Sequence, residues 1–270
     1  MDVSVIISTY NEPGWLEKAL WGWDAQSERD FELLVADDGS GPETAARIER
    51  LQAETGLAIR HVWQEDEGFR KSAILNRAIE AAAGDYLVFS DGDCIPRADF
   101  LATHMHRARA GRYLSGGYFK LPRALSEALT REDVRAGRPF DVAWLDAHGV
   151  ERTKARLLLT ASPLWARLLN RVSTTRPTWN GHNSSGWKAD LVAVNGFNEA
   201  MGYGGQDREL GYRLANSGVR PLQIRFSTVC VHLEHPQGWR TEEAVAASKA
   251  IIDETVRTGR TWIDEGLRRG

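Results

Sequence analysis

The chain has 270 residues, and its 34 Lys and Arg residues nearly balance its 37 Asp and Glu residues, giving a formal net charge of −3 at pH 7. This balance lacks the basic footprint of a nucleic-acid-binding protein, so we expect no nucleic-acid partner. A hydrophobic fraction of 42% and a charged fraction of 26% are typical of a globular protein with a substantial core, and they exclude a disordered chain.

Strands and helices alternate in the first third of the chain. Short apolar runs predict strands over residues 3–9, 31–36, 57–63 and 86–90. The segments between them predict helices from about Trp15, from Pro42 to about residue 54, and over 71–83. This β-α-β-α-β-α-β series predicts an α/β fold in which helices flank both faces of a mostly parallel sheet.

Acidic and polar residues follow three of these strands. They are Asn11 and Glu12 after the first strand, Asp37 and Asp38 after the second, and Asp91 and Asp93 after the fourth. Ligands of parallel α/β sheets bind outside the carboxyl ends of the strands. We therefore expect these loops to converge on one rim.

Helical patterns replace strands between residues 122 and 179. Ser162-Pro163 has the form of a helix N-cap and first position, and apolar residues from 164 to 172 follow on one face. Residues 152–176 contain six basic residues and no acidic one. This stretch is either a solvated helical face or a segment that makes peripheral contact with a membrane surface.

The last third returns to mixed structure. A turn at Asn195-Gly196 precedes a glycine-rich approach to a helix that opens at Gln206. A strand over residues 225–231 leads to His232, and a final helix starts at about Thr241.

The cysteines and the N-terminal residues indicate a reduced, cytoplasmic protein. Cys94 and Cys230 are too few for a disulfide scaffold, and residues 1–7 lack a basic leader and cleavage site. No uncharged apolar run approaches the roughly 20 residues of a membrane-spanning helix.

The pair Asp91 and Asp93 is presented on a tight turn around Gly92. Divalent cations that also hold a diphosphate need only one or two carboxylates, although Asp-Gly-Asp is equally good turn chemistry. The position beside two other acidic loops favours the metal interpretation.

Asp37 and Asp38 either form a strand-ending turn or supply a carboxylate that binds a uracil ring or a ribose hydroxyl. Of the two residues, Asp38 is the favoured candidate for this binding role.

Three further features could carry chemistry. His232 or His235 is a candidate metal ligand for manganese-type ions, or a packing residue. Asp207 is either a first-turn acid of its helix or a general base on a mobile loop. Arg70 and Lys71 are either cations that bind a phosphate of a ligand or two ordinary basic residues on the surface of a helix.

Ten tryptophans are an unusual number for this length. We expect four to fill the core of the first half: Trp15, Trp21, Trp23 and Trp63. Five lie in the half expected to meet an acceptor, where one or two could stack on a sugar: Trp144, Trp165, Trp179, Trp187 and Trp239. Trp262 has no assigned place.

The motifs together resemble glycosyltransferase family 2, the inverting nucleotide-sugar transferases of GT-A fold. The resemblance covers residues 1–120 and 180–237, and within the family it is greatest to the GalNAc-transferring domains of chondroitin polymerases. It is carried by residues 5–12, 35–40, 68–71 with 76–79, and 89–96, and by a galactosyltransferase-type segment at 194–199 and 204–210.

The resemblance implies roles for individual residues. Thr9, Glu12 and Asp38 would hold the uridine of a UDP-sugar donor. The donor side would also include Arg70, Lys71, Asn76 and Asp91, with Asp91 near the ribose and the metal. Asp93 would be the principal ligand of Mn²⁺ or Mg²⁺, with His232 or alternatively His235, and Asp207 would be the general base.

Two positions depart from the family pattern. Gln206 stands where the family usually has Glu, and Leu75 stands where an Arg often precedes the Asn. The first departure leaves Asp207 as the one acid at the proton-transfer step. The second removes one expected phosphate contact.

The resemblance also implies one GT-A domain over residues 1–270. Its parts would be a nucleotide-sugar-binding half (1–121), a helical insertion (122–179), an acceptor and catalytic segment (180–240) and a C-terminal helix (241–270).

The expected reaction is transfer of a hexose or N-acetylhexosamine to an oligosaccharide or lipid-linked saccharide acceptor. A non-catalytic nucleotide-sugar or carbohydrate-binding protein of the same fold is the alternative. The first loop lacks the glycines of a sugar-nucleotide pyrophosphorylase.

Overall fold

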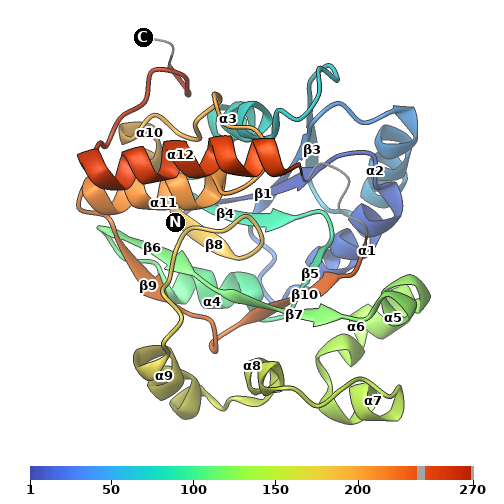
Figure 1. Cartoon of the computed structure of the whole chain (residues 1–270). Coiled ribbons are helices and arrows are strands. Elements are labelled where there is room, and N and C mark those ends of the chain that lie inside the picture. The colour runs from blue at the N-terminus through green and yellow to red at the C-terminus, as the bar shows by residue number, and fades with distance from the viewer. Residues whose placement is uncertain (236–240, 269–270) are drawn as a thin grey trace.

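A seven-stranded sheet forms the centre of the molecule in a computed structural model that describes residues 1–235 and 241–268 (Figure 1). Its order is β3 (Ile59–Trp63), β2 (Glu32–Asp37), β1 (Val3–Thr9), β4 (Tyr86–Asp91), β8 (Ser184–Trp187), β6 (Arg112–Ser115) and β9 (Arg220–Gln223). The first four strands are parallel, as predicted. Strand β8 runs antiparallel to both β4 and β6.

Helices cover both faces of this sheet, which confirms the predicted layers. One core cluster packs α1 (Pro13–Asp24), α2 (Pro42–Thr55) and α4 (Phe100–Arg107) against the sheet. The other packs α3 (Lys71–Ala81), α10 (Lys188–Ala193) and α11 (Gln206–Asn216). Residues of β1 alternate between the clusters, Val5 and Ile7 in the first and Ile6 in the second, because successive strand side chains point to opposite faces.

A second, three-stranded sheet joins the first half of the chain to the last third. Strand β10 (Val229–Leu233) lies between β5 (Cys94–Pro96), to which it is antiparallel, and β7 (Gly117–Leu121), to which it is parallel. The strand expected over 225–231 therefore starts and ends later. Residues 224–228 form a turn instead, in which Ser227 and Thr228 donate to the carbonyl of Ile224.

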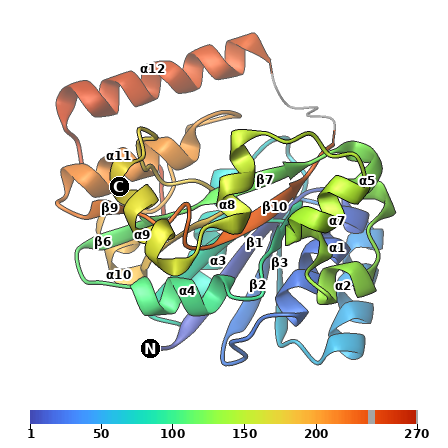
Figure 2. The same cartoon turned by 90° about the horizontal axis from the view of Figure 1, so that it is seen from below.

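The middle segment is helical, as predicted, and packs on this second sheet. It contains α5 (Arg123–Ala128), α6 (Arg131–Arg135), η1 (Arg138–Phe140), α7 (Val142–Ala147), η2 (Lys154–Arg156), α8 (Leu157–Thr160) and α9 (Pro163–Val172). Leu129, Val134, Leu145 and Leu158 bury their side chains against β7 and β10. These helices gather along one side of the molecule (Figures 1 and 2). Pro163 opens α9 as expected, although the Ser162 hydroxyl makes no capping bond.

The C-terminal helix α12 (Glu242–Thr258) lies along α11 (Figure 1). It is shorter than the helix expected over 241–270, because Gly259 adopts a left-handed conformation (φ 66°) that ends it. The segment after it is held by Asn195, whose side-chain amide donates to the carbonyl oxygens of Ile263 and Arg268.

A buried ion pair ties α11 to its neighbours. Arg213 and Glu209 are both fully buried and joined at 2.7 Å. The Arg213 guanidinium also donates to the carbonyls of Val194 and Gly196, and the Thr255 hydroxyl of α12 donates to Glu209 at 3.0 Å. One pair of side chains thus links α11, α12 and the turn at 194–196.

The tryptophans only partly follow the prediction. Trp23 is fully buried, but Trp63 is 51% exposed because β3 is an edge strand. Trp179, expected near the acceptor, is a core residue with 1% exposure. Trp239 falls within residues 236–240, outside the described residues. No helix in the described ranges combines the length and apolar character needed to cross a bilayer.

Candidate active site

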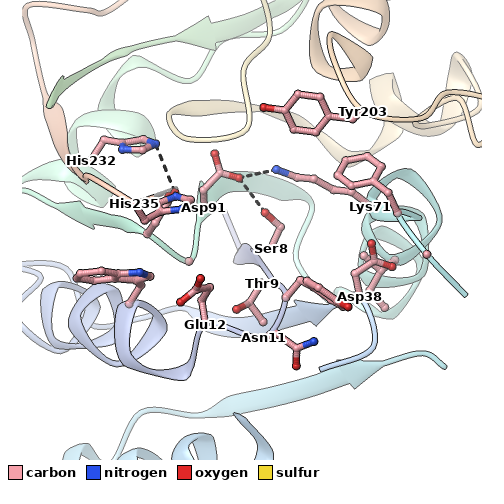
Figure 3. Close-up of a pocket in the computed structure, with 17 residues that line it drawn as sticks. Ser8, Thr9, Asn11, Glu12, Asp38, Lys71, Asp91, Tyr203, His232 and His235 are labelled. Carbon is pink, nitrogen blue, oxygen red and sulfur yellow. Dashed lines mark hydrogen bonds and ion pairs between the residues drawn. The ribbon is translucent and has the colours of Figure 1, made fainter. Parts of the chain in front are cut away.

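A pocket of about 530 Å³ opens where the carboxyl ends of the strands meet. Figure 3 shows polar side chains from widely separated segments pointing into it. The lining includes Ser8 and Thr9 at the end of β1 with Asn11 and Glu12 after it, Asp38 after β2, Lys71 at the start of α3, Asp91 at the end of β4 with Asp93 after it, and His232 and His235 from β10 and the residues after it. The predicted convergence of the three loops is confirmed.

The two acidic residues at the end of β2 and directly after it have different surroundings. Asp37 points away from the pocket, accepting from the backbone N–H of Ser40 and bonding His61 at 2.8 Å. Asp38 lines the pocket, and its carboxylate accepts from Gln64 Nε2 at 2.6 Å and from the backbone N–H of Arg70 at 2.8 Å. Burial raises the pKa of Asp38, opposed by these two bonds. Asp38 is therefore the member of the pair positioned to meet a ligand.

Asp91 lies between a cation and a hydroxyl. Its Oδ1 is 2.7 Å from Lys71 Nζ and accepts from Ser8 Oγ at 2.8 Å (Figure 3). Burial opposes ionisation of Asp91, but the Lys71 charge outweighs it and lowers the pKa of Asp91 to about 2. Burial likewise opposes protonation of Lys71, but the carboxylates of Asp91 and Asp207 raise its pKa above the usual value. Both groups are therefore charged at neutral pH.

Asp93 meets two imidazoles from the opposite end of the chain. Its Oδ2 is 2.6 Å from His235 Nε2 and 3.3 Å from His232 Nε2. The two imidazole rings are parallel, with centroids 5.8 Å apart. Strand pairing explains the approach, since β10 lies beside β5 and Leu233 donates to the carbonyl of Asp93. The structure brings both histidines to the same carboxylate oxygen, so His232 and His235 remain alternatives as ligands.

Ligand atoms of Asp93, Cys94 and His232 lie within 4.8 Å of one another, close enough to hold a metal ion. The oxygen and imidazole nitrogen donors suit an ion of the manganese type. Burial raises the pKa of the Cys94 thiol well above its usual value, which keeps the sulfur protonated and disfavours it as a ligand.

Asp207 lies beside Asp91, across Gly181. A Cβ built on Gly181 would be 3.0 Å from Asp91 Oδ1 and 3.4 Å from Asp207 Oδ2. Burial raises the pKa of Asp207 to about 6; Lys71 lowers it and Asp91 raises it further. Its Oδ1 is buried without a hydrogen-bond partner among the described residues. Asp207 does not line the pocket itself. Tyr203, four residues before it in the chain, does.

Two residues expected on the donor side have other contacts. Asn76 is 2% exposed, and its amide bonds the backbone N–H and carbonyl of Phe197 and the carboxylate of Glu199. Its hydrogen-bonding groups are therefore used inside the protein, and the expected donor contact is corrected to a structural link. The Arg70 side chain pairs with Glu67 outside the pocket lining, so Arg70 supports the site through its backbone N–H to Asp38.

Some site residues were not anticipated from the sequence. His182 packs edge-on against Tyr118, and burial lowers the pKa of His182 to about 4, opposed by Asp91. Phe69 and Tyr203 contact each other edge to face at 5.5 Å, and both line the pocket. Phe69 lies within the 68–71 motif but had no assigned role, whereas His182 and Tyr203 belong to no motif with recognisable chemistry. Only the tertiary fold brings Tyr203 to the pocket and His182 near Asp91.

Comparison with known proteins shows that the chain is similar to glycosyltransferases. Residues 4–121 match the sequence model of glycosyl transferase family 2. "Validoxylamine A glucosyltransferase" of Streptomyces hygroscopicus subsp. jinggangensis is 31% identical over 265 residues, covering 91% of this chain and 58% of that protein. "Uncharacterized glycosyltransferase YfnE" of Bacillus subtilis is 26% identical, covering 93% and 70%. "Chondroitin synthase" of Escherichia coli is 27% identical, covering 92% and 37%. The chain thus spans less than two thirds of the length of two of these three relatives.

Solved structures share the fold. The mannosyltransferase PcManGT from Pyrobaculum calidifontis, in complex with GDP-Man and Mn²⁺, has a TM-score of 0.58 at 23% identity, covering 88% of this chain and 58% of that one. S. aureus TarS 1–349, in complex with UDP-GlcNAc, has a TM-score of 0.56 at 17% identity, covering 88% and 60%. Residues 4–121 thus match glycosyltransferase family 2, and the architecture of the chain is the GT-A fold of known glycosyltransferases.

Proposed function

We propose that this glycosyltransferase moves a hexose or N-acetylhexosamine from a UDP-sugar to a saccharide acceptor, with inversion at the anomeric carbon and dependence on a divalent metal. The observation that carries the proposal is the convergence on one pocket of Asp38, Asp91, Asp93 and Lys71, with two histidines and the adjacent Asp207. These groups match, in type and position, the needs of nucleotide binding, diphosphate departure and proton removal.

Thr9, Glu12 and Asp38 would bind the uridine. The Asp38 carboxylate, held by Gln64 and the Arg70 backbone, is oriented to accept a hydrogen bond from a base or ribose. Lys71 would exchange part of its contact with Asp91 for the diphosphate. The structural relative TarS is described in complex with UDP-GlcNAc, which supports a UDP-sugar as donor.

Mn²⁺ or Mg²⁺ would be held by Asp93 with His232 or His235. The donor set fits, because one carboxylate oxygen and two imidazole nitrogens face one another and a neutral imidazole is a competent ligand for manganese. When bound, the ion neutralises charge on the departing nucleoside diphosphate. PcManGT is described with Mn²⁺ in its complex, which supports a divalent metal in this fold.

Asp207 would remove the proton from the attacking hydroxyl of the acceptor. The pKa of Asp207, raised to about 6, is close to the range where a general base is both ionised at neutral pH and able to hold a proton. Attack opposite the departing diphosphate inverts the anomeric carbon. Gln206, in place of an acid, leaves Asp207 as the base at this step.

The acceptor would be an oligosaccharide or a lipid-linked saccharide of bacterial surface polysaccharide synthesis. A Campylobacter jejuni relative, 28% identical over 109 residues, is named "GalNAc(5)-diNAcBac-PP-undecaprenol beta-1,3-glucosyltransferase".

We propose a cytoplasmic location, supported by two buried free thiols, Cys94 and Cys230. Peripheral membrane contact through residues 152–176 is part of the same proposal.

The decisive experiment measures UDP release from a panel of UDP-sugars, with saccharide acceptors, in the presence of Mn²⁺, Mg²⁺ or a chelator. We expect turnover with one donor, lost with the chelator and lost in Asp93→Asn. Asp99→Asn, a change of the same kind at a carboxylate outside the pocket lining, is the control. Turnover at the full rate in Asp93→Asn would contradict the metal assignment.

A non-catalytic binding protein of the same fold is the alternative, and Gln206 is the observation that favours it. Calorimetry distinguishes the two. Binding of UDP without transfer to any acceptor, together with unchanged behaviour of Asp207→Ala, would establish the binding protein.

A further inference from the structure

Helix α9 turns its apolar side chains away from the protein. Leu164 is 82% exposed, Trp165 62%, Leu168 47% and Val172 61%. Their spacing places them on one face of the helix. A surface helix of a globular protein normally buries its apolar stripe, so the orientation of α9 is the reverse of the usual one.

The opposite side of α9 is anchored to the body of the protein. Asn170 Nδ2 donates to Ser227 Oγ at 2.9 Å, and Asn170 Oδ1 accepts from the backbone N–H of Phe226 at 2.9 Å. Ala166, on the same side, is buried. Rolling the helix to bury its leucines would break both hydrogen bonds, so the outward direction of the apolar face is built into the fold.

Cations accompany this face. Of the six basic residues in 152–176, Arg152 and Arg156 pair with Asp146. The other four have no ion-pair partner within the described parts of the chain: Lys154, Arg167, Arg171 and Arg176. Arg167 and Arg171 belong to α9 itself and flank the apolar stripe at helical spacing. Figure 2 shows α9 on the side of the molecule that carries the helical segment.

We propose that α9 docks in the interface of an anionic lipid membrane, with its apolar stripe among the acyl chains and its arginines on lipid phosphates. Interfacial helices combine an apolar face with flanking Lys and Arg, and Trp favours the headgroup boundary. A second copy of the chain fits less well, because it would bring the same arginines to the contact and α9 offers no acidic residue to pair with them. This docking specifies the peripheral membrane contact of the proposed function, and its vesicle test is separate from the UDP-release test of the transfer reaction.

The test is co-sedimentation of the full chain with vesicles of phosphatidylcholine alone, or of phosphatidylcholine and phosphatidylglycerol in equal amounts. We expect binding to the mixed vesicles that weakens in high salt. The double variant Leu164→Ser/Leu168→Ser should lose binding. Val256→Ser, which removes a side chain 53% exposed on α12, is the matched control and should bind like the parent protein.

Two further variants separate the contributions of charge and insertion. Arg167→Gln/Arg171→Gln should weaken binding to the mixed vesicles by about twentyfold and change binding to pure phosphatidylcholine little, because each cation near an anionic surface contributes about fivefold. The mixed vesicles should shift tryptophan fluorescence to the blue, and Trp165→Phe should remove that shift while still binding. All of these side chains are exposed, and circular dichroism melting checks that the variants fold.

Two results would overturn the proposal. One is the absence of sedimentation with mixed vesicles, or sedimentation that the α9 variants leave unchanged. The other is a stable dimer in sedimentation velocity without lipid that the leucine variants dissociate, since a second copy would then cover this face.

Discussion

The positive charge of Lys71 acts on two neighbouring carboxylates, Asp91 and Asp207, whose pKa values nevertheless differ. Its ion pair with Asp91 overcomes burial and takes the pKa of Asp91 to about 2. It also opposes the effect of burial on Asp207, yet the pKa of Asp207 stays near 6. Environments that push the pKa values of neighbouring acids apart assign them different roles. Asp91 is suited to be a permanent anion near the donor, and Asp207 is suited to exchange a proton.

The rate of transfer should therefore depend on pH through Asp207. Because the base must be ionised, kcat/KM should rise with pH and level off above an apparent pKa of about 6. Lys71→Met should move this midpoint upward, since the lysine charge favours the carboxylate. The measurement is a pH–rate profile at saturating metal, and a flat profile below pH 6 would argue against Asp207 as the base.

Asp207→Asn should abolish activity and stabilise the protein. Loss of a general base lowers kcat by about 10²- to 10⁴-fold. The raised pKa of Asp207 means that the folded protein holds this proton more tightly than the unfolded chain, so its ionisation costs stability as pH rises from the ordinary Asp value to about 6. At pH 7 the amide should add about 3 kcal/mol to the free energy of unfolding. Urea unfolding of this variant and of Asp253→Asn, an exposed control, provides the comparison.

Much of the site could be predicted at the level of single residues, with clear limits. Asp38, Asp91 and Asp93 were predictable because they follow parallel strands whose ends must meet. Arg70 and Asn76 were not, because the direction of a side chain depends on partners such as Glu67 and Phe197 that no local pattern reveals.

At the level of elements, Asn76 connects α3 to the turn before α11. Asn76→Ala would leave the backbone groups of Phe197 without their partner inside the protein. We expect a loss of about 2–3 kcal/mol in unfolding free energy with little change in UDP affinity. Arg77→Ala, on the exposed side of α3, is the control. A large loss of UDP affinity at unchanged stability would restore Asn76 to the donor site.

Removing the cation of the buried Arg213–Glu209 pair should cost far more stability than removing the cation of an exposed pair of the same spacing. Arg213→Met leaves a buried carboxylate without its cation, which costs about 3–5 kcal/mol. Lys249→Met breaks the Lys249–Asp253 pair, also four residues apart but largely exposed, and should cost less than about 1 kcal/mol. Chemical denaturation measures both, and equal effects would mean that the buried pair does not hold the three elements together.

Elements with strong local signals were predicted well, and tertiary pairing decided the others. The helix at Pro42 and the strand over 3–9 have the expected bounds. Strand β10 starts later than predicted because its register is set by pairing with β5 and β7 rather than by its apolar run. Similarly, only the position of β3 at the edge of the sheet exposes Trp63.

For the whole molecule, the alternation of strands and helices in the first third was enough to predict the layers. It could not predict that β8 would insert antiparallel between β4 and β6, because these strands are distant in sequence and have no turn in common. The second sheet was likewise beyond local reasoning. Its three strands are short and come from three separate regions of the chain.

Acid should destabilise the folded protein through a buried histidine. His104 is fully buried, its ring nitrogens bond Ser185 at 2.7 Å and Asn183 at 2.9 Å, and burial lowers its pKa to about 4. The unfolded chain takes up this proton near pH 6.5, so stability falls as pH drops from about 6.5 to about 4, by about 3 kcal/mol. Asp207 acts in the opposite direction over part of this window. The urea midpoint should therefore fall more steeply with acid in Asp207→Asn than in the parent protein.

Strand β10 also has a consequence for the order in which the site is made. Asp93 and His235 are 142 positions apart, so a ribosome adding about 5–20 residues per second takes about 7–28 s to pass from one to the other. Throughout that interval the nascent chain carries the carboxylates of the rim without the imidazoles of β10 and the residues after it. A chain released before Val229 would contain β1 to β4 but neither His232 nor His235, the two histidines of the proposed metal site. The proposed metal site therefore assembles only after β10 has been made, well after the strands β1 to β4.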